Sequence, residues 1–356
     1  MNNKSTDKMN FKISVIIPIF NAERHLEKSI ESIIQQSIGF ENIELLLIDD
    51  NSKDSSTSII QKYAKDYKNI VPIYLNKNSG NASTPRNIGI KKSTSKYLMF
   101  LDSDDIYEPD MCEKFYNHIL NENADCISCN YNIIDNIHSS KVKLPFNFEK
   151  QQEYENKIII ESENLIEFDN VYVWNKIFKK SIIMENNIFF KESISEDFIF
   201  CIEYLLKSKK RVYLKNYYGY NKFLQEESLS IKEISLTSVY NHINVDYKIS
   251  ELIKNNFKNK NYVKKINNNV FKEPIKWVIE EFVTLSNTDD IRKGMEYLCS
   301  FEKSIEFEST LNNILLNIIN KLILKQKWFL AIIIIKVGKI FLNVSITRKI
   351  YRIISN

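Results

Sequence analysis

The sequence predicts a doubly wound, mostly parallel α/β sheet flanked by helices, followed by a helical C-terminal region. From residue 13 to residue 101, nearly continuous apolar runs rich in β-branched residues alternate with stretches whose apolar residues recur at helical spacing. Such runs are typical of strands that are buried on both faces of a parallel sheet. Their alternation with helices indicates right-handed crossovers. In sheets of this kind, ligands bind beyond the carboxyl ends of the strands.

The predicted elements of the first 131 residues follow one another in order. Residues 1–10 are polar, and we expect them to form a disordered tail. Strands are predicted at 13–19, 43–48, 70–75, 96–101 and 125–131. Helices are predicted over 21–39, around 59–63, from the polar loop 76–83 to residue 92, and over 109–120.

The second half of the chain changes character twice. Residues 133–161 are polar and are interpreted as a loop with an edge strand. Strand-like residues return at 171–178, and Glu196 and Asp197 precede a helix over 198–206. Further helices are predicted at 240–253, 273–286, 290–301 and 311–324. The predicted organisation is therefore a tail (1–10), an α/β catalytic domain (11–230) and a helical region (231–356).

The composition is that of a globular protein, with 44% apolar and 26% charged residues. Because 49 basic residues nearly balance 45 acidic ones, we expect no nucleic-acid partner. The GxGxxG and GxxxxGK[ST] fingerprints are missing, which disfavours dehydrogenases and P-loop enzymes. Five cysteines without a framework pattern, and no signal sequence before Phe11, predict a reducing cytoplasm. We interpret the CxxC pair Cys126 and Cys129 as core residues.

The end of the chain has a distinctive charge pattern. After Glu308 there is no acidic residue, but eight lysines and arginines. Lysines interrupt the apolar run of residues 328–354 too soon for a bilayer span of about 20 residues. One interpretation is a basic amphipathic helix lying in the membrane interface. The other, weighed equally, is a terminal helix packed on its own domain or in a homo-oligomer.

The most informative stretch is Asp102-Ser103-Asp104-Asp105, where a buried strand ends in three carboxylates. Carboxylates this close repel one another unless a cation neutralises them. Asp-x-Asp places two oxygen ligands on one side of an extended backbone, which suits Mg²⁺ or Mn²⁺ holding a diphosphate. The alternative is a turn that caps the helix starting near Pro109.

These motifs together resemble a family-two inverting glycosyltransferase, a GT-A enzyme that uses a nucleotide-sugar donor. The resemblance covers residues 12 to about 222, with the motifs in the order of the family. Its motifs are Val15–Asn21 at the first strand, Ile48–Ser52 at the second, Asn78–Gly89, Phe100–Asp104, Trp174–Lys176 and Glu196–Asp197. Pro85 departs from the pattern, because the family usually has a small residue before the arginine.

The resemblance implies a role for each matching residue. Pro18 and Phe20 would flank the base, and Asp50 would accept a hydrogen bond from the N3–H of uracil. Arg86 would lie by the nucleotide or its phosphates, with Ser103 among the donor-binding residues.

On the metal and acceptor side, the resemblance implies that Asp102 contacts the ribose or metal and that Asp104 is a direct ligand of Mn²⁺ or Mg²⁺. Asp197 would be the general base, with Glu196 and Trp174 on the acceptor side. Trp174 either stacks on a sugar ring or is buried behind the site, because tryptophan does both equally readily.

The chemistry requires the same groups. Charge on the departing diphosphate must be stabilised, and the attacking hydroxyl must lose its proton to a carboxylate across the crevice. A single base without a nucleophilic carboxylate fits direct displacement with inversion.

The predicted function is transfer of a hexose or N-acetylhexosamine from a UDP-sugar to a free or lipid-linked cell-surface glycan. Capsule, lipopolysaccharide and teichoic acid are all candidate acceptors. The alternatives are a sugar nucleotidyltransferase and an inactive transferase-like scaffold subunit. The predicted location is the cytoplasm, at the inner face of the cell membrane if the basic tail binds lipid.

Overall fold

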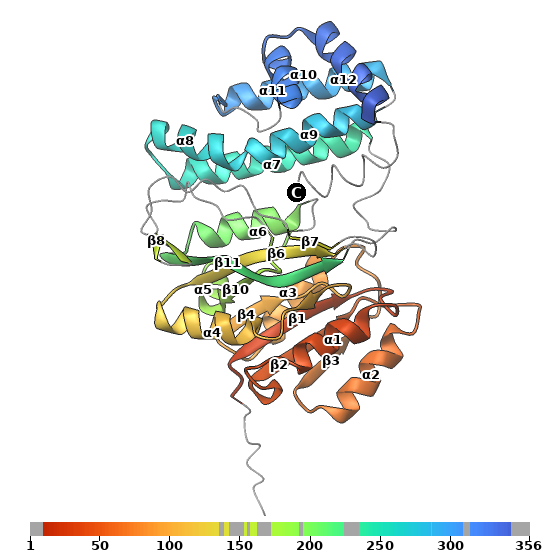
Figure 1. The fold of residues 1–356 in the computed structure, drawn as a ribbon, viewed down its shortest axis with the longest axis vertical. Helices are drawn as coiled ribbons and strands as arrows, with labels where there is room; N and C mark the ends of the chain where they lie inside the picture. The colour runs from red at the N-terminus through yellow and green to blue at the C-terminus, as the bar shows by residue number, and fades with distance from the viewer. Residues whose placement is uncertain are drawn as a thin grey trace, which may run out of the picture. The chain divides into compact units, whose positions relative to one another are not determined.

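A computed structural model describes residues 10–134, 139–141, 153–154, 157–161, 172–191, 195–223, 235–285, 287–308 and 314–342. The chain divides into two compact units (Figure 1). The first is an α/β unit that extends to residue 224, and the second is a helical unit formed mainly by the residues from 225 onward. The predicted disordered tail lies almost entirely outside the described residues.

The α/β unit is built on one mixed sheet whose first half is parallel. Its first four strands are β1 (Ile13–Ile19), β2 (Ile43–Asp49), β3 (Ile70–Tyr74) and β4 (Tyr97–Phe100). They lie in the order β3-β2-β1-β4, with every neighbouring pair parallel. All seven residues of β2 and six of the seven in β1 are buried, as the continuous apolar runs predict.

The second half of the sheet is mixed. Beyond β4 the order continues β10-β6-β11-β9-β8, with β5 paired to β11 and β7 to β6. These strands are β5 (Ile106–Tyr107), β6 (Cys126–Ile134), β7 (Ser139–Lys141), β8 (Glu153–Tyr154), β9 (Lys157–Glu161), β10 (Lys176–Lys179) and β11 (Lys210–Phe223). Strand β10 is antiparallel to both β4 and β6, whereas β6 and β11 are parallel. The mostly parallel α/β sheet is therefore confirmed, but the long strand β11 was not predicted.

Helices cover both faces of this sheet. They are α1 (Leu26–Ile34), the 3₁₀ turn η1 (Phe40–Asn42), α2 (Ser56–Asp66), α3 (Ser83–Lys92), α4 (Met111–Asn121), α5 (Lys180–Glu185) and α6 (Glu196–Leu205). Successive side chains of a strand point to opposite faces. Accordingly Val15 and Ile17 of β1 share a core with α1, whereas Ile16 between them contacts Gly89 of α3. The sheet is thus doubly wound, as predicted.

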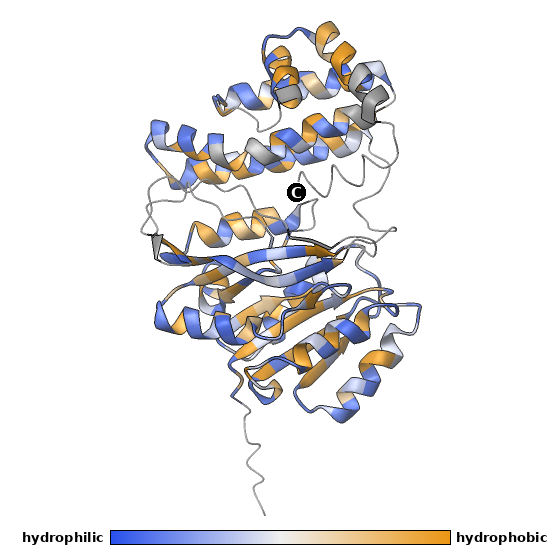
Figure 2. Cartoon of the chain, in the orientation of Figure 1, coloured by the Kyte–Doolittle hydropathy of each residue, from blue (hydrophilic) through white to orange (hydrophobic). Residues whose placement is uncertain are grey.

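The second unit consists of helices among the residues described. They are α7 (Leu236–Asn256), α8 (Lys260–Val270), α9 (Lys272–Thr284), α10 (Thr288–Ser304), α11 (Ile314–Leu324) and α12 (Trp328–Leu342). Four of the five predicted helical segments match them in order, α8 was not predicted, and the end of the segment 328–354 lies outside the described residues. Figure 2 colours α12 mostly as hydrophobic. None of the described helices has the length and apolarity needed to cross a membrane.

One close approach fixes how α3 lies on the sheet. A Cβ atom at Gly89 would lie 2.4 Å from Cγ2 of Ile16, which is nearer than two carbon atoms can pack. Only glycine therefore lets this helix come so near to β1. Arg86, one of the predicted donor-binding residues, lies on the same helix.

We predict that Gly89→Val lowers the free energy of unfolding by about 1–3 kcal/mol, because the added side chain overpacks the contact with Ile16. Urea unfolding measures the loss. Lys92→Ala, at an exposed position of the same helix, is the control and should change stability by less than about 0.5 kcal/mol. A Gly89→Val protein as stable as the wild type would contradict the close packing.

Candidate functional site

Asn21 links the ends of β1 and β2, and both strand ends carry an asparagine in the left-handed conformation. Asn21 has φ 49° and Asn51 has φ 62°, values that asparagine tolerates better than most residues. The backbone N–H of Asn21 donates to Oγ of Ser52 at 3.0 Å, and the N–H of Lys53 donates to Oδ1 of Asn21 at 2.8 Å. The adjacent Phe20 is left 48% exposed. An aromatic face is thereby presented at the carboxyl edge of the sheet.

Asp50 lies buried beside this edge and holds the loop that precedes α3. Its carboxylate accepts hydrogen bonds from the backbone N–H of Ser79, at 2.9 and 3.0 Å from its two oxygens, and from Oγ of Ser79 at 2.8 Å. A carboxylate offers about four acceptor sites. A bond to uracil N3–H stays a prediction, and Asp50 would have to share its carboxylate between Ser79 and the base.

The turn that follows β4 is held rigidly in place by its neighbours. The hydroxyl of Ser29 on α1 donates to the carbonyl oxygens of Ser103 at 3.0 Å and Asp105 at 2.7 Å. The Asp105 carboxylate is buried and accepts from the hydroxyl of Tyr220 at 2.6 Å and from the N–H of Phe223 at 2.8 Å. Of the three carboxylates, that of Asp105 therefore has a structural role.

The other two, Asp102 and Asp104, are half-buried. Burial, reinforced by the charge of Asp102, raises the pKa of Asp104 to about 6. Asp102–Asp105 does not cap a helix, because α4 begins only at Met111 and has Asp110 at its N-cap. The cost of ionising Asp104 would be relieved by a cation at this turn.

Arg86 connects this turn to the start of α6. Its guanidinium is 4% exposed and donates from Nη2 to Oδ1 of Asp102 at 2.8 Å. From Nη1 it donates to Oε1 of Glu196 at 3.0 Å and to Oδ1 of Asp197 at 2.7 Å. The structure thus brings together four residues that the sequence placed in one site. The guanidinium is engaged with carboxylates, whereas the resemblance placed Arg86 at the nucleotide.

Two contacts hold α3 close to α6 through Phe190. Asn87 exchanges both of its amide hydrogen bonds with the backbone of Phe190, at 2.8 and 2.9 Å. The ring of Phe190 stacks on Phe200 of α6 with centroids 4.1 Å apart. Pro85 lies in the first turn of α3, where a missing N–H breaks no helical bond, so it does not displace Arg86.

The charged groups of the cluster shift one another's pKa values. Burial opposes the charge of Arg86, but the carboxylates of Asp197, Asp102 and Glu196 outweigh it and raise its pKa above the usual value. Burial raises the pKa of Asp197 to about 7, even though Arg86 acts in the other direction. A carboxylate whose pKa lies near neutrality is suited to general base catalysis.

Trp174 is positioned behind the site. Its indole is 3% exposed and stacks on Tyr172 and Tyr220, with centroids 4.7 and 4.2 Å apart. Of its two interpretations, burial behind the site is the one that fits this geometry. Lys176 is buried as well and donates to the carbonyl of Tyr172 at 2.9 Å. Cys126 and Cys129 are buried, as predicted.

Lys222, near the end of β11, is a site residue that the sequence analysis missed. It is half-buried, with its ammonium 5.8 Å from the centroid of the Trp174 ring. Burial lowers its pKa, but Tyr172 and the carboxylates of Asp105, Asp102 and Asp104 outweigh this and raise it. A lysine in an unpredicted strand carries no signal in the sequence.

The residues present fit a divalent cation bound with few protein ligands. Within the described part of the chain, no group of three or more His, Cys, Asp or Glu side chains could hold a metal ion. Asp102 and Asp104 offer two hard oxygen ligands. Mg²⁺ commonly binds through one or two carboxylates, with phosphate oxygens and water completing its shell. Asp102 and Asp104 would therefore hold such an ion together with a diphosphate.

Sequence comparisons agree on one family. Residues 14–182 match the family profile described as Glycosyl transferase family 2. The chain is 34% identical over 245 residues to the poly(ribitol-phosphate) beta-N-acetylglucosaminyltransferase TarP of Staphylococcus aureus, covering 67% of this chain and 71% of TarP. It is 31% identical over 201 residues to a poly(ribitol-phosphate) beta-glucosyltransferase of Bacillus spizizenii, covering 56% of this chain but 30% of that protein.

A solved structure has a similar fold. Residues 1–349 of S. aureus TarS, crystallised with UDP-GlcNAc, superpose with a TM-score of 0.71. The superposition covers 89% of this chain and 88% of that chain, at 18% sequence identity. This likeness supports the GT-A fold of the sheet and its flanking helices.

We predict that Arg86→Met lowers the free energy of unfolding by about 2–4 kcal/mol near neutral pH, because it leaves three carboxylates facing one another without a cation. Lys62→Met is the control. It breaks an ion pair with Glu27 in which both side chains are more than half exposed, and should cost less than about 1 kcal/mol.

The same measurement at lower pH tests the electrostatic cause. Protonation of Asp197, whose pKa is about 7, weakens the repulsion in the variant and removes the ion pair of Asp197 with Arg86 in the wild type. The difference between the two proteins should therefore shrink as the pH falls from about 8 to about 5. A loss that is independent of pH would show that Arg86 acts by packing alone.

Proposed function

The chain belongs to glycosyl transferase family 2, and on that basis we propose that it transfers a hexose or N-acetylhexosamine from a UDP-sugar to a hydroxyl of a cell-surface glycan. The observation that carries the proposal is the bridge made by Arg86. It joins the candidate metal turn at Asp102 to the candidate base Asp197, so that the two groups needed for the reaction share one site.

The donor half of the proposal is supported by the carboxyl edge of the sheet. The exposed ring of Phe20 is suited to stack on a base, and Asp50 lies beside it with oxygen acceptors. TarS, whose structure has this fold, was crystallised with UDP-GlcNAc. We therefore propose UDP as the nucleotide of the donor.

The proposed reaction is a direct displacement. The acceptor hydroxyl gives its proton to Asp197 as its oxygen bonds to the anomeric carbon, and the bond from that carbon to the diphosphate breaks and releases UDP. Attack from the face opposite to the diphosphate inverts the anomeric centre. Arg86 holds the Asp197 carboxylate at 2.7 Å and thereby orients its free oxygen.

Asp102 and Asp104 would hold Mn²⁺ or Mg²⁺ against the diphosphate. Such an ion supplies positive charge where negative charge develops on the leaving group. Lys222 would add a positive charge of the protein itself, since Asp102 and Asp104 are among the carboxylates that raise its pKa.

The names of the relatives support a proposal for the acceptor class. Two similar proteins are named for transfer of sugars to poly(ribitol-phosphate), and others are named for minor teichoic acid biosynthesis. We propose a polymer of the teichoic acid type as the acceptor, free or lipid-linked, from among the cell-surface glycans considered. A sugar nucleotidyltransferase is disfavoured by the family, and an inactive scaffold by the presence of Asp102, Asp104 and Asp197 together.

The function is tested by incubating the chain with a panel of UDP-sugars and a poly(ribitol-phosphate) or poly(glycerol-phosphate) acceptor, with and without Mn²⁺. We expect acceptor-dependent release of UDP with one sugar preferred. Release of pyrophosphate would instead indicate a nucleotidyltransferase, and no turnover of any UDP-sugar would favour the scaffold.

We predict that Asp197→Asn lowers kcat by about 10²–10⁴-fold, because the amide keeps the contact with Arg86 but cannot take a proton. Isothermal titration calorimetry should show UDP binding unchanged. Glu196→Gln, which alters the neighbouring carboxylate held by the same guanidinium, is the matched control and should be far more active. An Asp197→Asn enzyme with wild-type turnover would exclude Asp197 as the base.

We predict that Asp104→Asn abolishes the dependence of UDP affinity on Mn²⁺, measured by titrating UDP with and without the metal. Asp105→Asn is the control, and it distinguishes an effect on metal binding from an effect on folding. Because Asp105 bonds to Tyr220 and Phe223, its substitution should lower the melting temperature yet leave the metal dependence of UDP affinity in place. If Asp105→Asn removed the metal dependence and Asp104→Asn kept it, Asp105 would be the metal ligand and Asp104 would not.

A further inference from the structure

Helix α12 has apolar residues on two sides, and among the described residues only one of these sides is buried. Ala331 and Ile335 are buried, at 0% and 1% exposure. Phe329, Leu330 and Ile333 are 75%, 46% and 42% exposed. They form one stripe, because residues three and four apart are neighbours on a helix surface. A helix that is apolar all round is normally buried.

This stripe, the residues Phe329, Leu330 and Ile333, is called here the α12 apolar face. Exposed lysines lie at both of its ends. Lys325 and Lys327 precede the helix, and Lys336 follows Ile333 by three residues on the same side. The α12 apolar face is therefore apolar at its centre and basic at both ends.

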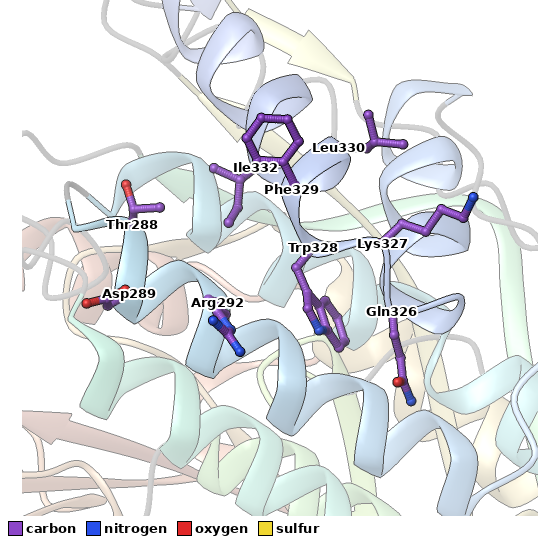
Figure 3. Close-up of a pocket in the computed structure, with 9 residues that line it drawn as sticks. All are labelled: Thr288, Asp289, Arg292, Gln326, Lys327, Trp328, Phe329, Leu330 and Ile332. Atoms are coloured by element: carbon purple, nitrogen blue, oxygen red, sulfur yellow. The ribbon is translucent and has the colours of Figure 1, made fainter.

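A shallow cavity of about 580 Å³ adjoins the start of α12. In Figure 3 the ring of Trp328 lies between the side chains of Arg292 of α10 and Gln326, whereas Phe329 and Leu330 lie on the opposite side of the start of α12. Lys336 donates to the hydroxyl of Thr288 at 2.7 Å, at the first residue of α10. These contacts hold α12 against α10 with its apolar face turned outward.

The charge of the chain is unevenly distributed along the sequence. Eight of the 49 basic residues lie after Glu308, where there is no acidic residue, so the preceding part of the chain has a slight excess of acidic residues. A symmetric contact with a second copy through the α12 apolar face would gather Lys325, Lys327 and Lys336 of both copies in one interface, where their charges would repel one another. An anionic surface is attracted, and a bilayer interface also accepts apolar side chains.

We propose that the α12 apolar face is a docking surface for an anionic lipid bilayer, with the helix lying in the plane of the interface. The 15 described residues of α12 extend for about 22 Å along the axis, which is long enough for an interfacial helix to present the α12 apolar face. This inference goes beyond the proposed function, because transfer to an acceptor in solution does not require it. Its effect is to hold the enzyme where acceptors attached to lipid are concentrated.

The test is sedimentation of the full chain with vesicles of phosphatidylcholine alone or mixed with phosphatidylglycerol. We expect binding to the anionic vesicles only, and weaker binding at high salt. The triple variant Phe329→Ser, Leu330→Ser, Ile333→Ser and the double variant Lys325→Gln, Lys327→Gln should each lower the partition coefficient at least about tenfold.

Leu120 and Met184, which are 48% and 45% exposed in the α/β unit, provide the matched control. Replacing both by Ser should leave vesicle binding unchanged, and all variants should keep the wild-type turnover with an acceptor in solution. Equal binding to neutral vesicles, or undiminished binding by the triple variant, would overturn the proposal. So would light scattering showing that the triple variant turns an oligomer into a monomer while vesicle binding persists, because the face would then belong to a second copy.

Discussion

The site depends on one guanidinium that is almost fully withdrawn from water. Carboxylates repel one another and lose hydration when they are gathered in a crevice, so a cluster of them is stable only around a cation. Arg86 supplies that cation from within the fold, with a planar fork that reaches Asp102 on one side and Glu196 and Asp197 on the other. A lysine, with a single charged nitrogen, could not span the three.

Much of the surrounding structure serves to deliver this side chain. Gly89 lets α3 lie directly on β1, and Asn87 fastens α3 to the segment that leads into α6. On the opposite wall, Ser29 fixes the turn after β4 through two carbonyl oxygens. Each contact is modest, yet together they determine the distance between Asp102, the proposed metal ligand, and Asp197, the proposed base.

The sequence was most informative where structure is encoded in neighbouring residues. Buried parallel strands appear as apolar runs, and their polar ends revealed Asp50, Asp102 and Asp104. Strand β11 escaped notice because lysines, asparagines and a glycine interrupt its pattern, and its burial comes from pairing with β6 and β9. The contact between Arg86 and Glu196, 110 residues apart, and the place of Lys222 depend on tertiary packing, which local patterns do not record.

The position of β10 also has a consequence for biosynthesis. It lies between β4 and β6, although it follows both along the chain. While the protein emerges from the ribosome, β1 to β4 can pair as soon as they are made, but the outer edge of β4 has no native partner until residues 176–179 appear. An open strand edge is a template for pairing with other chains. The nascent protein is thus most prone to misassembly during synthesis of the 75 or so residues that separate these strands.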